Sequence, residues 1–168
     1  YDPGVPIAYD LGTTVVSLVI AVAFICAGIA VAIWLPARAA AATGGAIVGL
    51  GVGSMHYTGM AAMELPARID WAHDLIAASI VIGAVMAGLA LIVARRRQDA
   101  TGALQGALVL TLAIVSLHFT GMGAVTVTPD PTRSASASAV PTDILAYGVA
   151  AAALLLVGLG LFTALVSR

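Results

Sequence analysis

Two histidines, each followed four positions later by a methionine, are the residues of this sequence whose types and spacing best suit chemistry. They lie in two related six-residue motifs, Met55-His56-Tyr57-Thr58-Gly59-Met60 and Leu117-His118-Phe119-Thr120-Gly121-Met122. Residues four positions apart lie on one face of a helix, so each pair can present an imidazole nitrogen and a thioether sulfur together. These donors suit copper, above all Cu(I). The pattern predicts a metal or gas-sensing site whose ligands are His56, Met60, His118 and Met122.

Two further methionines are additional ligand candidates. Followed along a helix, Met63 falls within about 20° of His56 around the axis, whereas Met55 points about 100° away. The position that corresponds to Met63 near the second motif is Val125, which has no donor atom. We therefore expect Met55 and Met63 to supply at most a supplementary ligand.

The same residues can also be interpreted without a metal. A buried histidine can hydrogen-bond to a neighbouring helix, a methionine can fill a gap in a core, and a threonine can bond to its own helix. Tyr57 can either pack or hydrogen-bond, and Phe119 favours packing in the second motif. Ionisable groups inside a membrane usually serve a function, and here the His–Met pairing occurs twice. The repetition favours the metal site.

The composition places the chain in a lipid bilayer. Its mean hydropathy is +1.09, and only 9% of its residues are charged, whereas a soluble domain carries roughly a quarter. The net charge of −1 gives no support to a nucleic-acid-binding surface. The single cysteine excludes an internal disulfide.

Five apolar segments are long enough to cross a bilayer as helices, which takes about 20 residues each. They are residues 11–35, 41–62, 75–94, 103–125 and 144–166. Strands are not expected there, because the segments lack period-two alternation and an open sheet leaves its backbone unsatisfied in lipid. We expect an all-α, polytopic transmembrane helix bundle that forms a single domain over residues 1–168. The expected connections are a tight turn at 36–38, an acidic loop at 64–74, a basic turn at 95–102 and a polar loop at 126–142.

The segments form repeated helix pairs. A serine lies 39 positions before the histidine in both pairs, at Ser17 and at Ser79. Aspartates 10, 74 and 143 each stand at the start of a segment, where a carboxylate can cap free N–H groups.

Three glycines extend the helix face that carries His56. Gly45, Gly49 and Gly53 follow one another at four-residue spacing, a pattern that lets another helix approach closely. His56 is therefore expected to face protein rather than lipid. His118 occupies the same depth on its own helix. We therefore expect both imidazoles to face the bundle interior at similar height, where the two motifs could share one site near the outer face.

The arginines indicate the orientation in the membrane, because cytoplasmic loops are enriched in them. If the 36–38 turn is cytoplasmic, five of the seven arginines share that side and only Arg68 and Arg133 lie outside. The motif ends then face the extracytoplasmic side of a bacterial inner membrane, and the C-terminus is cytoplasmic. Because an outside N-terminus without a signal peptide is unusual, we expect a further helix pair upstream.

The two motifs resemble those of the MHYT domain, a family of bacterial integral-membrane sensor modules. The first motif is a full match, and the second keeps His118, Thr120, Gly121 and Met122 but lacks the leading methionine and the tyrosine. The resemblance implies several transmembrane helices, usually with more motif copies than two. It also implies copper-mediated sensing of oxygen, carbon monoxide or nitric oxide, by modules that stand alone or precede histidine kinases or cyclic-di-GMP synthesis and breakdown domains.

We therefore expect a membrane sensor that detects a diatomic gas or a redox state through copper, with haem iron as the alternative cofactor. Its partners would be the lipid bilayer, the gas and a cytoplasmic signalling domain in the same or another chain. Catalysis is not expected, because no membrane-embedded carboxylate, Ser/His/Asp arrangement or HExxH motif is present. The alternatives are a copper-handling membrane protein and a structural bundle without metal.

The arginine distribution makes a topological prediction. A reporter fused in the basic turn at 95–102 should be active in the cytoplasm, and one fused in the polar loop at 126–142 should be active outside. Paired alkaline phosphatase and fluorescent-protein fusions measure both positions. The opposite pattern would contradict the orientation and would place the motifs at the cytoplasmic face.

Overall fold

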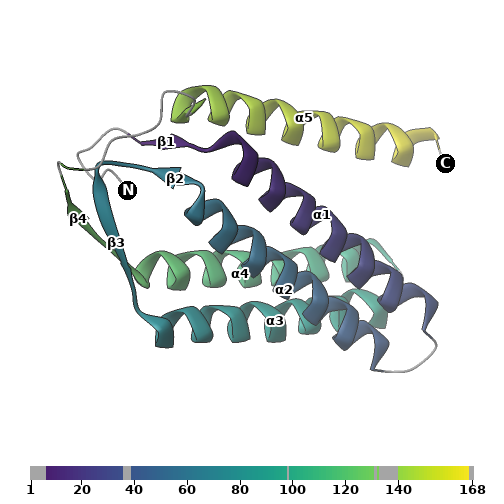
Figure 1. The fold of residues 1–168 in the computed structure, drawn as a ribbon. Helices are drawn as coiled ribbons and strands as arrows, with labels where there is room; N and C mark the ends of the chain where they lie inside the picture. The colour runs from purple at the N-terminus through teal and green to yellow at the C-terminus, as the bar shows by residue number, and fades with distance from the viewer. Residues whose placement is uncertain (1–6, 36–38, 98, 131, 133–139, 167–168) are drawn as a thin grey trace.

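The computed structural model describes residues 7–35, 39–97, 99–130, 132 and 140–166, and this part of the chain contains five long helices (Figure 1). They are α1 (Leu11–Trp34), α2 (Ala40–Ala61), α3 (His73–Arg96), α4 (Ala100–Gly123) and α5 (Thr142–Val166). The all-α prediction is confirmed, and each predicted helix end lies within three residues of the observed one. The turn at 36–38, Arg38, Arg133 and Arg168 lie outside the described residues.

Four helices are long and apolar enough to cross a membrane: α1, α3, α4 and the Thr142–Leu159 part of α5. The remaining helix, α2, lies between α1 and α3 (Figure 1). It is less apolar because six of its 22 residues are glycine. At 1.5 Å per residue it is about 33 Å long, which is close to the length of its neighbours.

Glycines allow α2 to pack backbone to backbone against α3. A Cβ atom at Gly45 or Gly49 would lie 2.7 Å or less from main-chain atoms of α3, closer than real side chains ever approach. At Gly53 the nearest side-chain atoms would be 3.6 Å away, which is ordinary van der Waals contact. The predicted close approach of another helix is therefore confirmed, and Gly45 and Gly49 are the positions that require it.

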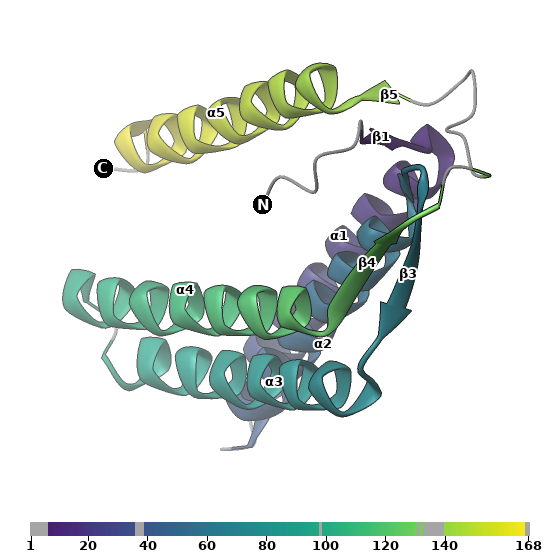
Figure 2. The ribbon, with the colours of Figure 1, turned by 90° about the vertical axis from the view of Figure 1, so that its left-hand side faces the viewer.

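The opposite face of α2 packs equally closely on α1. A Cβ atom at Gly28 would lie 2.7 Å from Val48, and one at Gly44 would lie 2.8 Å from the Cβ of Ala32. Helix α5 does not share this packing. It stands apart from the other four helices in both views (Figures 1 and 2), and none of the described side chains in its membrane-length part is buried.

Short strands close one end of each helix pair, which we call the motif end because His56 and His118 lie near it. Strands β1 (Ala8–Tyr9) and β2 (Met63–Glu64) pair antiparallel around the first helix pair. Strands β3 (Ala67–Trp71) and β4 (Val125–Pro129) do the same around the second. Strand β5 (Val140–Pro141) joins β1 and so gives the sheet order β2-β1-β5.

The two strand pairs have the same register. Tyr9 faces Met63 in one pair and Trp71 faces Val125 in the other, and the equivalent residues are 62 positions apart, as are His56 and His118. The regions 64–74 and 126–142 were predicted as loops, and the helix was predicted to continue to 125. Both predictions are wrong where the strands occur, because strands of two to five residues show too little alternation to be recognised in a sequence.

Capping differs between the two helix pairs. The Asp10 carboxylate accepts a hydrogen bond of 2.6 Å from the backbone N–H of Thr13 and so caps α1 as predicted. At the start of α3 the equivalent position is Ala72, which has no side-chain acceptor, and Asp74 lies inside the first turn. The prediction that Asp74 caps its helix is therefore wrong. Asp143 lies in the first turn of α5.

The other end of the bundle, which we call the arginine end, is held by polar contacts that the sequence pattern did not predict. Asp99 caps α4 by accepting a hydrogen bond of 2.8 Å from the backbone N–H of Gly102. Arg95 on α3 donates a hydrogen bond to the carbonyl oxygen of Ala32 in the last turn of α1. This contact joins α1 to α3 across the end of α2.

The close approach of α2 and α3 predicts that Gly49→Ala destabilises the protein. The added methyl group meets main-chain atoms that cannot rotate away, so we expect the free energy of unfolding to fall by about 1–3 kcal/mol. Thermal unfolding in detergent, followed by circular dichroism, measures this. The matched control is Gly123→Ala at the end of α4, where a Cβ would meet nothing within 4 Å. Equal melting temperatures for the two variants would contradict the backbone contact.

The Asp10 cap predicts a pH-dependent contribution to stability. The hydrogen bond from the Thr13 backbone N–H holds the pKa of Asp10 below its ordinary value of 3.8. The cap therefore contributes fully above the unfolded pKa and is lost as the pH falls through the folded pKa. Asp10→Ala should lower the melting temperature at neutral pH, and the difference from the natural chain should shrink below about pH 4. Asp74→Ala, which removes no capping bond, should have the smaller effect.

Candidate metal centre

One ring nitrogen of His56 is buried near the motif end of α2. Its Nε2 is buried and has no hydrogen-bond partner in the part of the chain that the structure describes. A buried polar atom without a partner costs about 1–3 kcal/mol, so it requires an explanation. A metal ligand needs a nitrogen of this kind, since its lone pair is not occupied by a hydrogen bond.

The two motif histidines are in direct contact. Their ring centroids are 5.1 Å apart and their planes are inclined at 79°. His118 is nevertheless exposed, whereas the preceding Leu117 is only 1% exposed and fills the core against Gly83. The expectation that both imidazoles face the bundle interior therefore holds for His56 and is wrong for His118. Successive residues point about 100° apart on a helix, so the inward position of Leu117 turns His118 toward the bundle edge.

Gly121 provides the space for His56. A Cβ atom at this position would lie 2.6 Å from His56 Nε2 and 3.1 Å from the Tyr57 hydroxyl oxygen. Any other residue would push the imidazole away from α4. The equivalent glycine of the first motif, Gly59, lies in open surroundings, with Ser17 Oγ 4.0 Å from a Cβ built there.

Tyr57 is fixed by its hydroxyl and by its ring. The hydroxyl lies 2.5 Å from Ser79 Oγ on α3. Ser79 is fully buried, and it donates its only hydroxyl hydrogen to the carbonyl of Ile76 at 2.8 Å. The Tyr57 hydroxyl is therefore the donor to Ser79.

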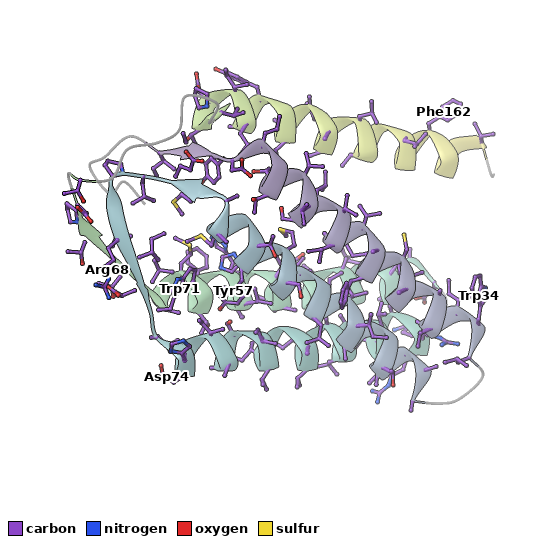
Figure 3. All side chains as sticks on the ribbon, viewed as in Figure 1. Trp34, Tyr57, Arg68, Trp71, Asp74 and Phe162 are labelled. Atoms are coloured by element: carbon purple, nitrogen blue, oxygen red, sulfur yellow. The ribbon has the colours of Figure 1, made fainter. Side chains whose placement is uncertain are left out.

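The ring of Tyr57 connects the motif to strand β3. Tyr57 and Trp71 lie beside each other at the motif end (Figure 3). The ring of Tyr57 contacts two other rings edge-on, at centroid distances of 5.9 Å to Trp71 and 5.0 Å to His56. In the sequence, Ser79 stands out only as a marker of the repeat, and no motif connects Trp71 with the site. Both contacts join segments far apart in the chain, so no local spacing could have revealed them. Phe119 replaces the tyrosine in the second motif, where its ring contacts His118 at 5.5 Å.

The methionines are arranged less uniformly than their spacing predicted. Met60, one turn beyond His56, is buried, and Met122 and Met55 are half-buried. Met63 lies in β2, beyond the end of α2 at Ala61. The helical angle that placed Met63 near His56 is therefore wrong. Thr58 and Thr120 are both half-buried on their helices.

The donor set limits which metal would fit. Among the described residues there is no cluster of three or more His, Cys, Asp or Glu side chains. A metal bound by His56 and His118 would therefore need thioether sulfur as well. That combination fits Cu(I) and differs from the usual ligand set of Zn²⁺. Cys26 is exposed on α1.

Comparison with known proteins identifies relatives in bacterial signalling. Residues 1–45 and 49–107 match the MHYT family, described as "Bacterial signalling protein N terminal repeat". The chain is 36% identical over 149 residues to an "Uncharacterized signaling protein" of Caulobacter vibrioides, which covers 89% of the chain and 18% of that relative. No solved structure matches.

Two relatives from Pseudomonas aeruginosa are named for cyclic di-GMP turnover. The bifunctional diguanylate cyclase/cyclic di-GMP phosphodiesterase MucR is 36% identical over 130 residues, covering 71% of this chain and 18% of MucR. The cyclic di-GMP phosphodiesterase NbdA is 42% identical over 83 residues, covering 46% of this chain and 11% of NbdA. The chain thus spans less than a fifth of the length of these relatives.

The family match covers more than half of the chain and includes the first motif. It agrees with the four apolar helices of membrane-spanning length, which make this a multi-pass membrane protein. The repeated motif, the paired helices and the signalling relatives lead to one conclusion: the chain belongs to the MHYT family of bacterial signalling proteins.

Proposed function

We propose that this chain is the sensing module of a signalling protein in a bacterial inner membrane, and that it binds copper through His56, His118, Met60 and Met122. The observation that carries the proposal is the buried Nε2 of His56, which lacks a partner among the described residues and lies beside the ring of His118. When bound there, copper would supply a soft coordination position for oxygen, carbon monoxide or nitric oxide, or a one-electron change that reports redox state.

Copper has more support at this position than haem. The two imidazoles are in ring contact, with centroids 5.1 Å apart, so no macrocycle fits between them as they stand. A single ion needs no such space, because the two rings are already in contact and Met60 and Met122 each lie one helical turn beyond a motif histidine. The arginine distribution supports an extracytoplasmic position for this edge.

The residues around His56 restrict its movement and connect it to other helices. Tyr57 links the motif to α3 through Ser79, and Gly121 places α4 against the imidazole. Since α2 meets α1 and α3 at main-chain contacts, side-chain rearrangement cannot absorb a displacement of α2. A change at His56 would therefore shift α2 against its neighbours, down to the arginine end where Arg95 joins α3 to α1.

The named relatives suggest the kind of output. MucR and NbdA carry the names of cyclic di-GMP enzymes, and matches to the present chain cover less than a fifth of each. We propose that the helices pass their displacement to a cytoplasmic signalling domain of this class, in the same chain or in a partner. The chain itself acts as the sensor and not as the enzyme.

The proposal predicts that copper retention depends on both histidines. His56→Ala should abolish copper binding, because it removes the buried donor, and His118→Ala should have the same effect if the two rings share one ion. Met60→Leu keeps the volume and removes the sulfur, so it should weaken Cu(I) binding by about tenfold or more. Metal analysis of the purified membrane protein and competition with a Cu(I) chelator measure these effects.

The control is Met86→Leu, which changes a methionine of α3 outside both motifs. It should leave copper binding unchanged. Melting temperatures of the metal-free variants separate loss of a ligand from loss of folding. Stoichiometric copper in a folded His56→Ala, His118→Ala double variant would overturn the proposal.

A further inference from the structure

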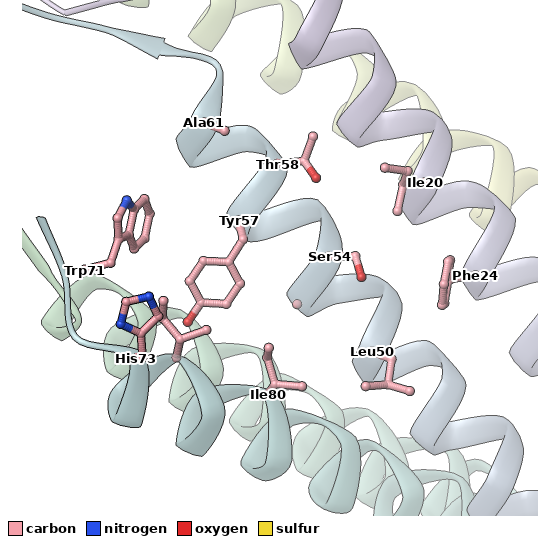
Figure 4. A pocket seen from close by; sticks show the side chains of 12 residues that line it. Ile20, Phe24, Leu50, Ser54, Tyr57, Thr58, Ala61, Trp71, His73 and Ile80 are labelled. Carbon is pink, nitrogen blue, oxygen red and sulfur yellow. The ribbon is translucent and has the colours of Figure 1, made fainter. Parts of the chain in front are cut away.

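A lateral groove lies on the side of α2 that faces away from the His56–His118 contact. It runs over α2 between α1 and α3 and has a volume of about 860 Å³ (Figure 4). The α2 residues Ser54, Tyr57 and Thr58 line it, and they lie about 100–200° around the helix from His56. Its apolar walls are Ile20 and Phe24 of α1, Leu50 of α2, and Ile76 and Ile80 of α3.

Two hydroxyl groups on the floor of this groove have no hydrogen-bond partner among the described residues. The side chains of Ser54 and Thr58 lie one turn apart and are half-buried, and they point toward α1 (Figure 4). Neither forms a side-chain hydrogen bond with any residue that the structure describes. Serine and threonine in membrane helices usually bond back to their own helix, as Ser17 and Thr111 do here. The two free donors indicate a hydrogen-bond acceptor that comes from outside the chain.

The charges around the groove favour a neutral acceptor over a phosphate. No arginine or lysine is among the lining residues, and the imidazole of His73 is the only lining side chain that can carry a positive charge. The next residue, Asp74, adds negative charge at that end of the groove. The nearest arginine along the chain, Arg68 on β3, is already paired with Asp70 at 3.0 Å. A lipid phosphate would therefore find little charge complementarity.

Three aromatic side chains line the same groove. Trp71 and Tyr57 lie at its motif end and Phe24 lies deeper (Figure 4). Sites of this kind, apolar and aromatic with a few polar groups, bind small amphiphilic molecules and orient them through the polar groups. An acyl chain would pack against the apolar walls but would leave the hydroxyls of Ser54 and Thr58 without a hydrogen-bond acceptor.

We propose that this groove binds a lipid quinone. The quinone ring is neutral and flat, and its carbonyl oxygens can accept hydrogen bonds from Thr58 and Ser54. The ring lies near Trp71 and Tyr57, and the apolar tail follows the walls formed by Phe24 and Ile80 toward the membrane interior. Binding in the groove does not depend on a metal at His56, which lies on the other side of α2.

Tyr57 connects this groove to the candidate metal centre. Its ring lines the groove, and the same ring contacts His56 at a centroid distance of 5.0 Å. A bound quinone would therefore affect the position of His56 through the ring of Tyr57. This link, unlike the binding itself, rests on the proposed function.

The two tryptophans allow a direct binding experiment, because quinones quench tryptophan fluorescence at short range. Trp71 lines the groove, whereas Trp34 is 80% exposed at the opposite end of α1 (Figure 3). The metal-free Trp34→Phe chain in phosphatidylcholine nanodiscs is titrated with decylubiquinone. We expect saturable quenching of Trp71. The Trp71→Phe chain, which reports from Trp34, should show only the linear quenching caused by partition into the bilayer.

Removal of the two donors tests the assignment of the ligand. Ser54→Ala with Thr58→Val should raise the apparent dissociation constant about fivefold or more, since each lost hydrogen bond weakens binding severalfold. The matched control is Thr111→Val, which removes a hydroxyl outside the groove that already bonds to Ala107. It should leave the titration unchanged. Melting temperatures show whether each variant is folded.

Three results would overturn the proposal. Linear and equal quenching of both tryptophans would show that no site exists. Decylbenzene has a ring and a tail but no carbonyl groups. If it displaces decylubiquinone as well as decylubiquinone itself does, the groove binds an apolar molecule and the hydroxyls do not select the ligand. Absence of saturation together with cross-linking of two chains through cysteines placed at Ile20 and Leu50 would show that a helix of a second copy fills the groove. Copper binding enters none of these measurements, so failure of this inference and failure of the proposed function are distinguishable.

Discussion

Main-chain contact between α2 and both of its neighbours is the constraint on which the rest of the structure depends. Gly44 and Gly45 are consecutive, yet one lies against α1 and the other against α3. A helix packed this closely on two sides cannot carry large side chains there, which explains why six of the 22 residues of α2 are glycine. Because interiors are close-packed, such contacts also fix the rotation of α2. That rotation directs His56 toward α4 and Ser54 toward the groove.

The protein is built from a repeat of 62 residues, and the surroundings of the candidate metal centre are set by the positions at which the two copies differ. The strand registers and the buried serines are the same in both copies. Tyr57, in contrast, corresponds to Phe119, and the capping residue Asp10 corresponds to Ala72. A hydroxyl bond to α3 therefore exists only for the first motif. The repeat supplies two similar helix pairs, and the unequal positions make the surroundings of His56 different from those of His118.

Tyr57 lies between two features on opposite sides of α2. Its ring contacts His56 on one side and lines the groove on the other, while its hydroxyl is fixed by Ser79. A buried hydrogen bond of this kind gives the ring a single orientation. The candidate metal centre and the groove are thus mechanically connected through one residue, and Trp71 extends the connection to the strands at the motif end.

The sequence by itself determined the five helices, the paired repeat, the close approach at Gly45 and Gly49, and the two motifs that contain the candidate ligands. These properties follow from hydrophobic length and from helical spacing, which are local. The short strands, the contacts of Ser79 and Trp71 with Tyr57, and the outward position of His118 were decided only in the tertiary structure. Each depends on which residue of one helix meets which residue of another. The rotation of α4 shows this, because Leu117 packs into the space beside Gly83 and thereby turns His118 to the edge of the bundle.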